Sequence, residues 1–351
     1  MKLADVIAVL ESAYPPKTAE KWDAVGLVCG DPADEVTRIL VCVDPTASTV
    51  DEAVERGAQL LLAHHPLLLR GVNGVPATDP KGALVHKLIR NGAALYCAHT
   101  NADSALPGVS DALAKAIGLT ITGPLDAAPR TPSDVLTTFV PVADAEQVLK
   151  ALTEAGAGSI GELTGHEETR IEVTAPRGRR DALVAALRAA HPYEEPRFTL
   201  HEVVDLPGDT GLGRIGELAE PEPLEVFAQR VADALPATVQ GVRAAGDPER
   251  LIKRVAVCGG AGDSFLNAVT RAGVDAYVTA DLRHHPASEH LEAGGPALVD
   301  VAHWASEWPW CEQAAEILRD AFGGRVDVLV STRRTDPWTV GATSSAVGGH
   351  A

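Results

Sequence analysis

The chain has 351 residues, of which 30 are Lys or Arg and 48 are Asp or Glu, so its formal net charge is −18. This acidic excess argues against a protein that coats nucleic acid, because such proteins neutralise phosphates with Lys and Arg. Apolar residues make up 46% of the chain, which is enough for large cores and excludes wholesale disorder. No apolar stretch approaches the roughly 20 residues that a membrane-spanning helix needs.

The cysteines and the first residues favour the cytoplasm. Five cysteines are scattered without a Cys-x-x-Cys pair, a usage typical of reduced thiols. The first ten residues, MKLADVIAVL, include an acidic residue and do not make a secretory signal. We therefore expect a cytoplasmic protein, and at about 150 residues per domain we expect two or three domains.

Strands and helices alternate in the first third of the chain. The apolar runs at 38–43, 60–63 and 93–98 have the length of buried strands, and residues 50–56 and 84–90 have helical spacing. This alternation predicts an α/β layer with a largely buried sheet.

The α/β pattern is interrupted in the middle of the chain. A Pro-rich stretch at 123–134 is interpreted as a linker, and a Gly-rich break follows at 206–216. Between them, a β-α-β-α-β order predicts a small ferredoxin-like α+β unit. We predict a two-part α/β body at 1–130 and 208–340, a ferredoxin-like insert at 131–207, and a loose tail at 341–351.

Two adjacent histidines follow the second apolar strand. His64 and His65 come directly after the run at 60–63, and Pro66 then turns the chain. At a strand end such a pair can splay around two neighbouring ions, and neutral imidazole is a strong ligand for zinc, iron, nickel and copper. The alternative interpretation is one core histidine and one surface histidine.

Polar residues also follow the third strand. His99 and Asp103 lie just beyond it, and ligand sites in open α/β sheets lie outside the carboxyl ends of strands. The Asp103 carboxylate suits a divalent ion. Its alternative role is to cap the helix that follows.

A third pair, His303 and Glu307, follows a later apolar strand. The i, i+4 spacing puts both side chains on one face of a helix, as in helical zinc motifs. Trp304, Trp308 and Trp310 flank the pair and are expected to form an apolar wall that strengthens the electrostatics of the site. The alternative is an ordinary helix start with an acidic first turn.

Together, three histidines and two carboxylates lie at three separate strand ends. With one carboxylate bridging, five such ligands suit two divalent ions and water. Two neighbouring ions lower the pKa of a shared water and supply a hydroxide nucleophile near neutral pH, which is hydrolytic chemistry.

Two further motifs carry weaker signals. The pair His284-His285 follows Asp281 and echoes the first histidine pair, so His285 is a candidate acid–base residue, with a surface turn as the alternative. Residues 259–264 follow a strand and open a helix, which is phosphate-binding geometry, but they match neither a Walker A loop nor a clean dinucleotide fingerprint.

In this order the motifs resemble the Nif-three-like family with a dinuclear metal centre, also catalogued as GTP cyclohydrolase 1 type 2 homologues. The matching pieces are KWDAVGLVCG at 21–30, AHHP at 63–66, AHTNAD at 98–103, GLGRIGE at 211–217, CGGAGD at 258–263, TADLRHH at 279–285 and DVAHWASE at 300–307. The insert is similar to the PII- and CutA-like domain of longer family members.

The resemblance implies two divalent metal ions per subunit and a toroidal homohexamer. Carried over by motif, the ligands are His64, His65, Asp103, His303 and Glu307, with Glu307 bridging. His99 and His285 would lie nearby as candidate proton shuttles. Ligands of this mix accept Zn, Fe, Mn, Co or Ni, so the sequence does not identify the metal.

Two functions stay open at this point. The first is a metal-dependent hydrolase that acts on a nucleotide or a related small molecule through metal-activated water. The alternative is a non-catalytic, metal-binding or regulatory assembly whose insert senses a ligand or partner. The expected partners are a small-molecule substrate and further copies of the chain, and no membrane is expected. A third and weaker alternative is a ring that encircles nucleic acid, and the net charge of −18 counts against it.

Overall fold

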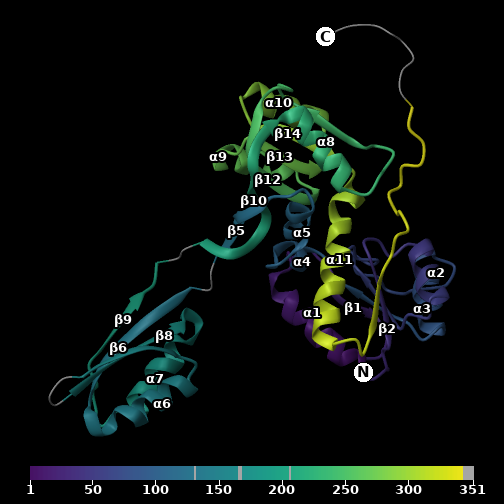
Figure 1. Cartoon of the computed structure of the whole chain (residues 1–351). Helices are drawn as coiled ribbons and strands as arrows, with labels where there is room; N and C mark the ends of the chain where they lie inside the picture. Colours follow the sequence, from purple (N-terminus) through teal and green to yellow (C-terminus); the bar gives the residue numbers. More distant parts are fainter. Residues whose placement is uncertain (130–131, 165–167, 205–206, 343–351) are drawn as a thin grey trace. The chain divides into compact units, whose positions relative to one another are not determined.

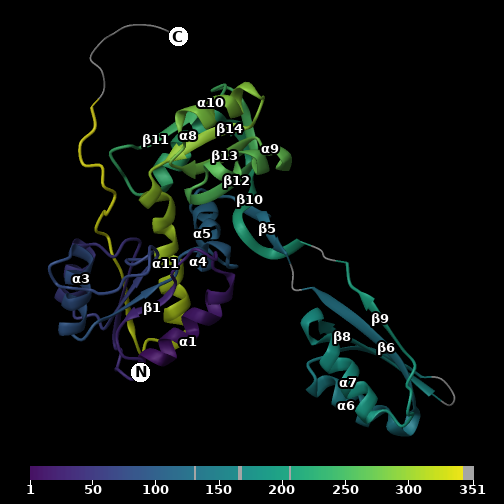
Figure 2. The ribbon, with the colours of Figure 1, turned by 180° about the vertical axis from the view of Figure 1, so that it is seen from behind.

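A computed structural model describes residues 1–129, 132–164, 168–204 and 207–342. The chain divides into two compact units (Figures 1 and 2). The body comprises Met1–Ala127 and Asp209–Ala351, and the smaller unit comprises Ala128–Gly208. Both units combine sheets with helices, so the predicted α/β fold class is confirmed.

A five-stranded sheet forms one half of the body. Its strand order is β1-β4-β3-β2-β15, and all neighbours are parallel except the β1–β4 pair. The strands are β1 (Gly26–Cys29), β2 (Arg38–Cys42), β3 (Leu60–Ala63), β4 (Ala94–Cys97) and β15 (Asp327–Val330). Strands β3 and β4 are buried at every residue, which explains why their sequences are continuously apolar.

A six-stranded sheet forms the other half. Its order is β11-β14-β13-β12-β10-β5, with β12, β13 and β14 parallel to one another. The strands are β5 (Thr120–Pro129), β10 (Pro207–Pro223), β11 (Val242–Ala245), β12 (Leu251–Ala261), β13 (Ala276–Ala280) and β14 (Ala297–Val301).

The helix α11 (His303–Phe322) packs against both sheets of the body. It contacts β2 and β15 of the five-stranded sheet and β12 and β13 of the six-stranded sheet. Its buried residues share one large core with α1 (Leu3–Ala13), α5 (Val109–Ala116) and α8 (Leu224–Ala234). Figure 1 shows α11 as the long yellow helix that links the two halves. Its first turn therefore lies where the two sheets approach each other.

The outer faces of the two sheets have their own cores. Helices α2 (Ala47–Glu55) and α3 (Pro80–Arg90) cover the five-stranded sheet, and α9 (Leu266–Ala272) and α10 (His284–Glu292) cover the six-stranded sheet. Local sequence sets the helix ends: Asp79 accepts hydrogen bonds from the first N–H groups of α3, and Gly323 ends α11 in a left-handed conformation. The short helix α4 (Thr100–Ser104) follows β4.

A buried ion pair ties the motif GLGRIGE to the core of the body. Arg214 on β10 is 1% exposed, and its Nε lies 3.0 Å from the Asp111 carboxylate on α5. The same guanidinium donates to the carbonyl oxygens of Gly211, Gly213 and Ala105. Because all these partners are buried, the pair is satisfied without water and fixes β10 against α5.

The smaller unit has a four-stranded antiparallel sheet of order β7-β8-β6-β9, with two helices. Its elements in chain order are β6 (Ser133–Pro141), α6 (Ala145–Glu154), β7 (Gly158–Thr164), β8 (Glu168–Pro176), α7 (Arg180–Ala190) and β9 (Phe198–Glu202). The sequence analysis expected five of these six elements and missed β7, whose Gly-Ser start resembles a turn. The ferredoxin-like assignment stays a prediction, with which this β-α-β-β-α-β order agrees.

The chain passes between the two units within the predicted breaks, after Ala127 and after Gly208, but both stretches are largely strands where the structure describes them. The stretch 123–134 falls largely in β5 and β6, and 206–216 falls largely in β10. Strand β5 lies at a sheet edge, where proline is tolerated. Glycine in β10 permits close packing of backbones, because a Cβ on Gly216 would lie 2.9 Å from the Thr120 carbonyl oxygen. Residues 343–351 of the predicted tail lie outside the described residues.

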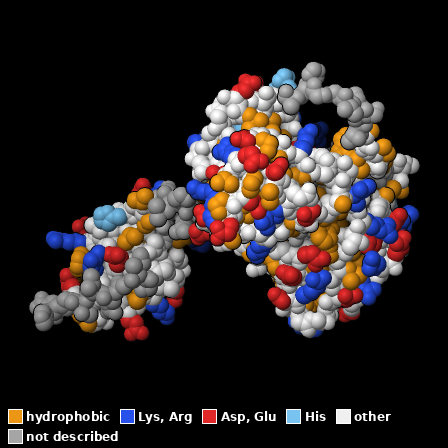
Figure 3. All heavy atoms as spheres, turned by 45° about the horizontal axis from the view of Figure 1, so that its top comes forward, with side chains coloured by type: hydrophobic (Ala, Val, Ile, Leu, Met, Phe, Trp, Pro, Cys, Tyr) orange, Lys and Arg blue, Asp and Glu red, His pale blue; other side chains and the backbone are white. Residues whose placement is uncertain are grey.

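The surface is chemically mixed, and no described helix is long and apolar enough to cross a bilayer. On the face in Figure 3, acidic and basic side chains are interspersed. All five cysteines are free thiols in the structure.

Candidate metal centre

The predicted ligands come together at the first turn of α11. His64 and His65 follow β3, and Asp103 lies on α4 just after β4. His303 and Glu307 lie on α11, directly after β14. Because β3 and β4 are parallel neighbours, their carboxyl ends lie at one edge of the sheet, and α11 brings its two residues to that edge.

Glu307 is the centre of the cluster. Its Oε1 lies 3.1 Å from His303 Nε2 and 3.5 Å from His64 Nε2, and its Oε2 lies 3.1 Å from His65 Nε2. Asp103 Oδ1 lies 3.8 Å from His64 Nε2. The two oxygens of Glu307 thus face different imidazoles, which is the arrangement that a bridging carboxylate requires.

The ring nitrogens define two ligand groups that share one histidine. His64, His65 and His99 form one group, and His65, His303 and Glu307 form the other, each with its ligand atoms within 4.8 Å of one another. The structure therefore brings His99, expected only as a nearby proton shuttle, into the cluster itself. Asp103, predicted as a ligand, is in neither group.

Each histidine of the cluster is held by an oxygen acceptor at Nδ1. The Nδ1 atoms of His65, His99 and His303 lie 2.7, 2.8 and 2.6 Å from carboxylate oxygens. His64 Nδ1 lies 2.8 Å from the Ala98 carbonyl oxygen. Such partners fix the tautomer and orient the opposite nitrogen, Nε2, toward a metal.

The sequence analysis missed the three carboxylates that orient these rings. They are Asp44 on His65, Asp23 on His99 and Asp281 on His303. Asp44 follows β2 and Asp281 follows β13, so their places at strand ends were the available signal. Among described non-glycine residues, Asp281 alone has a positive φ, +57°, and strained backbone of this kind is concentrated at functional sites.

The negative charge of Glu307 stabilises positive charge on the groups around it. Burial opposes protonation of His65 and His303, but the charge of Glu307 raises their pKa values to about 11 and about 10. Burial also opposes ionisation of Glu307, yet the surrounding histidines hold its pKa well below the usual range. Burial raises the pKa of Asp103 to about 6. A buried site that holds anionic Glu307 in this way suits cations.

Unpartnered buried atoms show that the residues fit a metal. His64 Nε2 and Glu307 Oε2 are buried and have no hydrogen-bond partner, since the approach of His65 to Oε2 lacks hydrogen-bond geometry. Leaving such atoms unpaired is costly, whereas coordination to a cation would satisfy both. Gly260 adds space beside them, because a Cβ at this residue would collide with Glu307 Oε1.

The tryptophan wall forms in part. Trp310 is fully buried with its ring 5.2 Å from the His64 ring, and Trp304 lines a cavity beside His65 and His303. Trp308 instead donates a hydrogen bond to the Ser331 carbonyl oxygen. Two of the three indoles therefore border the cluster.

Two weaker sequence motifs take other positions. His285 is exposed in the first turn of α10 next to His284, and no contact among the described residues joins it to the cluster. The stretch 259–264, a weak candidate for a phosphate-binding loop, begins inside a strand, since Gly259 and Gly260 are still part of β12. Gly260 donates its N–H to Ser306 Oγ, so this backbone packs against α11 beside Glu307.

Comparison with known proteins identifies the family. The family described as Duf34/NIF3 (NGG1p interacting factor 3) matches residues 1–337. The chain belongs to the Duf34/NIF3 family. The resemblance predicted from its motifs is thereby confirmed.

Relatives of this Duf34/NIF3 protein match it over nearly their full length. The GTP cyclohydrolase 1 type 2 homolog of Mycobacterium tuberculosis is 54% identical over 97% of each chain. The crystal structure of the Staphylococcus aureus protein SA1388 matches with a TM-score of 0.84 at 31% identity, covering 97% of this chain and 99% of that chain. A Bacillus cereus protein related to NIF3 matches with a TM-score of 0.78 at 32% identity over the same shares.

The orienting carboxylates lead to a first prediction for this Duf34/NIF3 protein. Asp281→Asn should weaken zinc binding by roughly 10- to 100-fold, because a neutral amide holds the His303 ring less firmly than a carboxylate. Asparagine tolerates the positive φ of this residue, so the backbone should be retained. Competition with a chromophoric chelator measures the dissociation constant. Asp320→Asn on the exposed face of α11 is the control, and equal affinities in the two variants would contradict the assignment.

The close approach of β12 leads to a second prediction. Gly260→Ala should lower the free energy of unfolding by about 2–5 kcal/mol, of which about 1–2 kcal/mol is backbone strain at its φ of +68° and about 1–3 kcal/mol is the clash with Glu307. It should also reduce the metal content, because the new methyl group displaces Glu307. Gly273→Ala is the matched control, since Gly273 has a φ of +63° but no atom lies within 4 Å of a Cβ placed on it. It should cost about 1–2 kcal/mol of backbone strain and leave the metal content unchanged. Urea unfolding and elemental analysis measure both. Equal metal content in the two variants would count against the prediction.

Proposed function

We propose that this protein is a dinuclear metal-dependent hydrolase of the GTP cyclohydrolase 1 type 2 kind, acting on a nucleotide or a related small molecule. The observation that carries the proposal is the convergence of four imidazoles on Glu307 and on one another, with each imidazole oriented by an oxygen at Nδ1. Asp103 adds a second carboxylate 3.8 Å from His64 Nε2. The name of the Mycobacterium tuberculosis relative, GTP cyclohydrolase 1 type 2 homolog, supports a nucleotide substrate.

The ligands in this proposal are His64, His65, Asp103, His303 and Glu307. Two divalent cations bound there would lower the pKa of water and polarise the bond to be cleaved. The chain itself provides the surroundings: Trp310 packs against His64 and keeps the inner side of the site dry. The opposite side opens to a cavity of about 360 Å³ lined by His65 and His303, through which a substrate reaches the cluster.

We assign proton transfer to His99. Asp23 holds its Nδ1 and accepts hydrogen bonds from the backbone N–H and hydroxyl of Thr100, so the carboxylate is itself fixed. The ring of His99 lies 5.2 Å from that of His64 and 5.5 Å from that of His65, close enough to exchange protons with groups in the site through one water. His285 has no comparable position.

A substitution of the bridging carboxylate tests the proposal. Loss of a residue that only orients a metal ligand lowers metal affinity by about 10- to 100-fold. Glu307 is itself a proposed ligand, so Glu307→Gln should lower turnover by more than about 100-fold and reduce bound metal below about two ions per chain. Elemental analysis measures the metal, and a panel of nucleoside triphosphates measures turnover.

Glu316→Gln is the control for this experiment. Glu316 is exposed on the same helix, so the variant makes the same change of charge away from the cluster. Its metal content and turnover should equal those of the wild type. Unchanged turnover of Glu307→Gln would reject the catalytic assignment.

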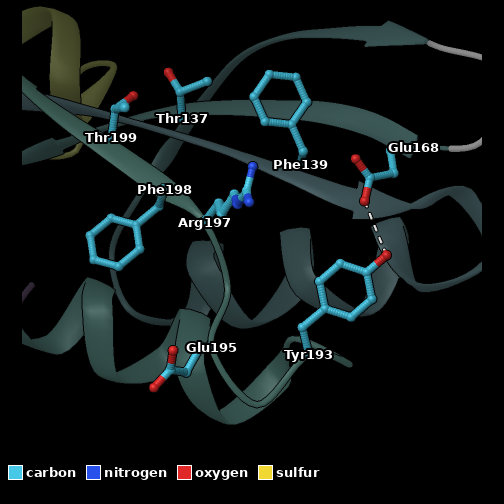
Figure 4. Close-up of a pocket in the computed structure, with 8 residues that line it drawn as sticks. All are labelled: Thr137, Phe139, Glu168, Tyr193, Glu195, Arg197, Phe198 and Thr199. Carbon is cyan, nitrogen blue, oxygen red and sulfur yellow. Dashed lines mark hydrogen bonds between the residues drawn. The ribbon is translucent and has the colours of Figure 1, made fainter.

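A second candidate function is ligand sensing by the smaller unit, favoured by a cavity of about 630 Å³ within it. Figure 4 shows the Arg197 side chain among the rings of Phe139, Phe198 and Tyr193. Tyr193 donates a hydrogen bond to Glu168 across the cavity, at 3.0 Å. A cation beside aromatic rings suits an anionic ligand with a planar group. In this alternative the protein binds metal without turning over any substrate.

Thermal stability separates the two candidates. If the smaller unit is the sensor, GTP or ATP should raise the melting temperature of the wild type, and Arg197→Ala should abolish the rise. Arg188→Ala, an exposed change on α7, should retain it. A rise that persists in Arg197→Ala but is lost in Glu307→Gln would place nucleotide binding at the metal centre instead.

The homohexamer, the cytoplasmic location and the identity of the metal stay predictions from the sequence.

A further inference from the structure

The chain returns to the metal centre after strand β15. That strand ends at Val330, and residues 335–338 line the same cavity as His65 and His303. Thr335 is half-buried in this lining and lies 291 positions after Asp44, the carboxylate beside His65 Nδ1. A segment from the far end of the chain therefore reaches the part of the site that follows β2 and β3.

Hydrogen bonds anchor the start of this segment to β2 and α2. The Ser331 N–H donates to the Val41 carbonyl oxygen at 2.8 Å, and the Ser331 hydroxyl donates to the buried Glu52 carboxylate at 2.6 Å. Arg333 donates to the Glu55 carboxylate, also at 2.6 Å. These contacts fix the backbone close to Thr335.

Two consecutive hydrogen bonds connect Thr335 to a proposed metal ligand. Thr335 Oγ1 donates to Asp44 Oδ2, and Asp44 Oδ1 lies 2.7 Å from His65 Nδ1. The backbone of Asp44 is also held, because its carbonyl oxygen accepts a hydrogen bond from the Thr49 hydroxyl at 2.6 Å. Both oxygens of the Asp44 carboxylate are thus engaged, so the carboxylate cannot rotate away from His65 without losing the bond from Thr335.

His65 is the histidine that the two ligand groups share. One group adds His64 and His99 to it, and the other adds His303 and Glu307. Its Nε2 lies 3.1 Å from Glu307 Oε2. A change in the orientation of the His65 ring therefore affects both groups, whereas a change in the orientation of His303 affects only one.

We propose that Thr335 is a positioning residue of the metal centre, whose hydroxyl fixes Asp44 and thereby the His65 ring that both ions require. The inference rests on the metal binding in the proposed function and does not depend on turnover. Loss of the hydroxyl leaves the carboxylate held on one side only, so the imidazole loses part of the preorganisation that tight metal binding needs.

Removal of the hydroxyl from the full-length protein tests the inference. Thr335→Val keeps the shape of the side chain and should raise the zinc dissociation constants of both ions by roughly 10-fold, because a hydrogen bond to a charged group is lost. Thr335→Ser keeps the hydroxyl and should bind zinc as the wild type does. Competition with chromophoric chelators measures the constants. Asp281→Asn, which affects the partner of His303, should weaken one ion only.

Thr332→Val is the matched control, because it makes the same substitution at an exposed residue of the same segment. Its zinc affinities should equal those of the wild type. Cobalt(II) supplies a second readout, since its visible absorption depends on ligand geometry. At saturating cobalt the spectrum of Thr335→Val should differ from that of the wild type, and the spectra of Thr335→Ser and Thr332→Val should match it.

A double-mutant cycle tests whether Thr335 acts through Asp44. Asp44→Asn should itself weaken zinc binding, and adding Thr335→Val to it should cause little further loss, because the connection to His65 is already broken. A double variant whose losses simply add would contradict the inference. The cycle measures affinity, so it does not depend on a known substrate.

The inference is overturned if Thr335→Val binds both ions as tightly as the wild type, if it weakens only one ion, or if Thr335→Ser or Thr332→Val is equally impaired. Absence of zinc binding by the wild type overturns it together with the metal centre. Failure of the proposed catalysis is a different result: zinc binding that follows the expected pattern, without turnover, supports the role of Thr335 and rejects only the hydrolase.

Discussion

A buried carboxylate surrounded by imidazoles is the constraint on which the rest of the structure depends. Glu307 is 3% exposed, and its oxygens face His64, His65 and His303. An isolated buried charge is strongly unfavourable, so the carboxylate needs cations or donors from every side. Elements from both sheets of the body meet here for that reason, and the chain uses a glycine, Gly260, where any side chain would intrude.

The packing of α11 makes this convergence rigid. The helix lies against both sheets, and one continuous core extends from α1 through α11 to α8. A ligand on α11 therefore moves little relative to ligands that follow β3. The orienting partners Asp44 and Asp281 follow strands of different sheets, so the two halves of the site are each positioned by their own sheet. Such support at the opposite side of each imidazole is what a preorganised metal site requires.

The elements that could be predicted from the sequence were those with strong local signals. The apolar runs that became β2, β3 and β4 are buried on both faces, and their composition alone reveals this. The two predicted breaks contain the points where the chain passes between the units, but their composition did not reveal that they are strands. Proline is tolerated in the edge strand β5, and glycine in β10 permits close contact between strands. Strand β7 was missed because its start has the composition of a turn.

The sequence by itself determined the chemical types available, the strand ends at which they occur and, through seven ordered motifs, the family. Only the tertiary structure decided which carboxylates orient the histidines, that His99 lies within the cluster and His285 does not, and that Thr335 contacts the carboxylate that orients His65. These relations join residues that are separated by tens to hundreds of positions, such as Asp44 and Thr335. Local composition carries no information about such distances, because they depend on how two sheets pack against one helix.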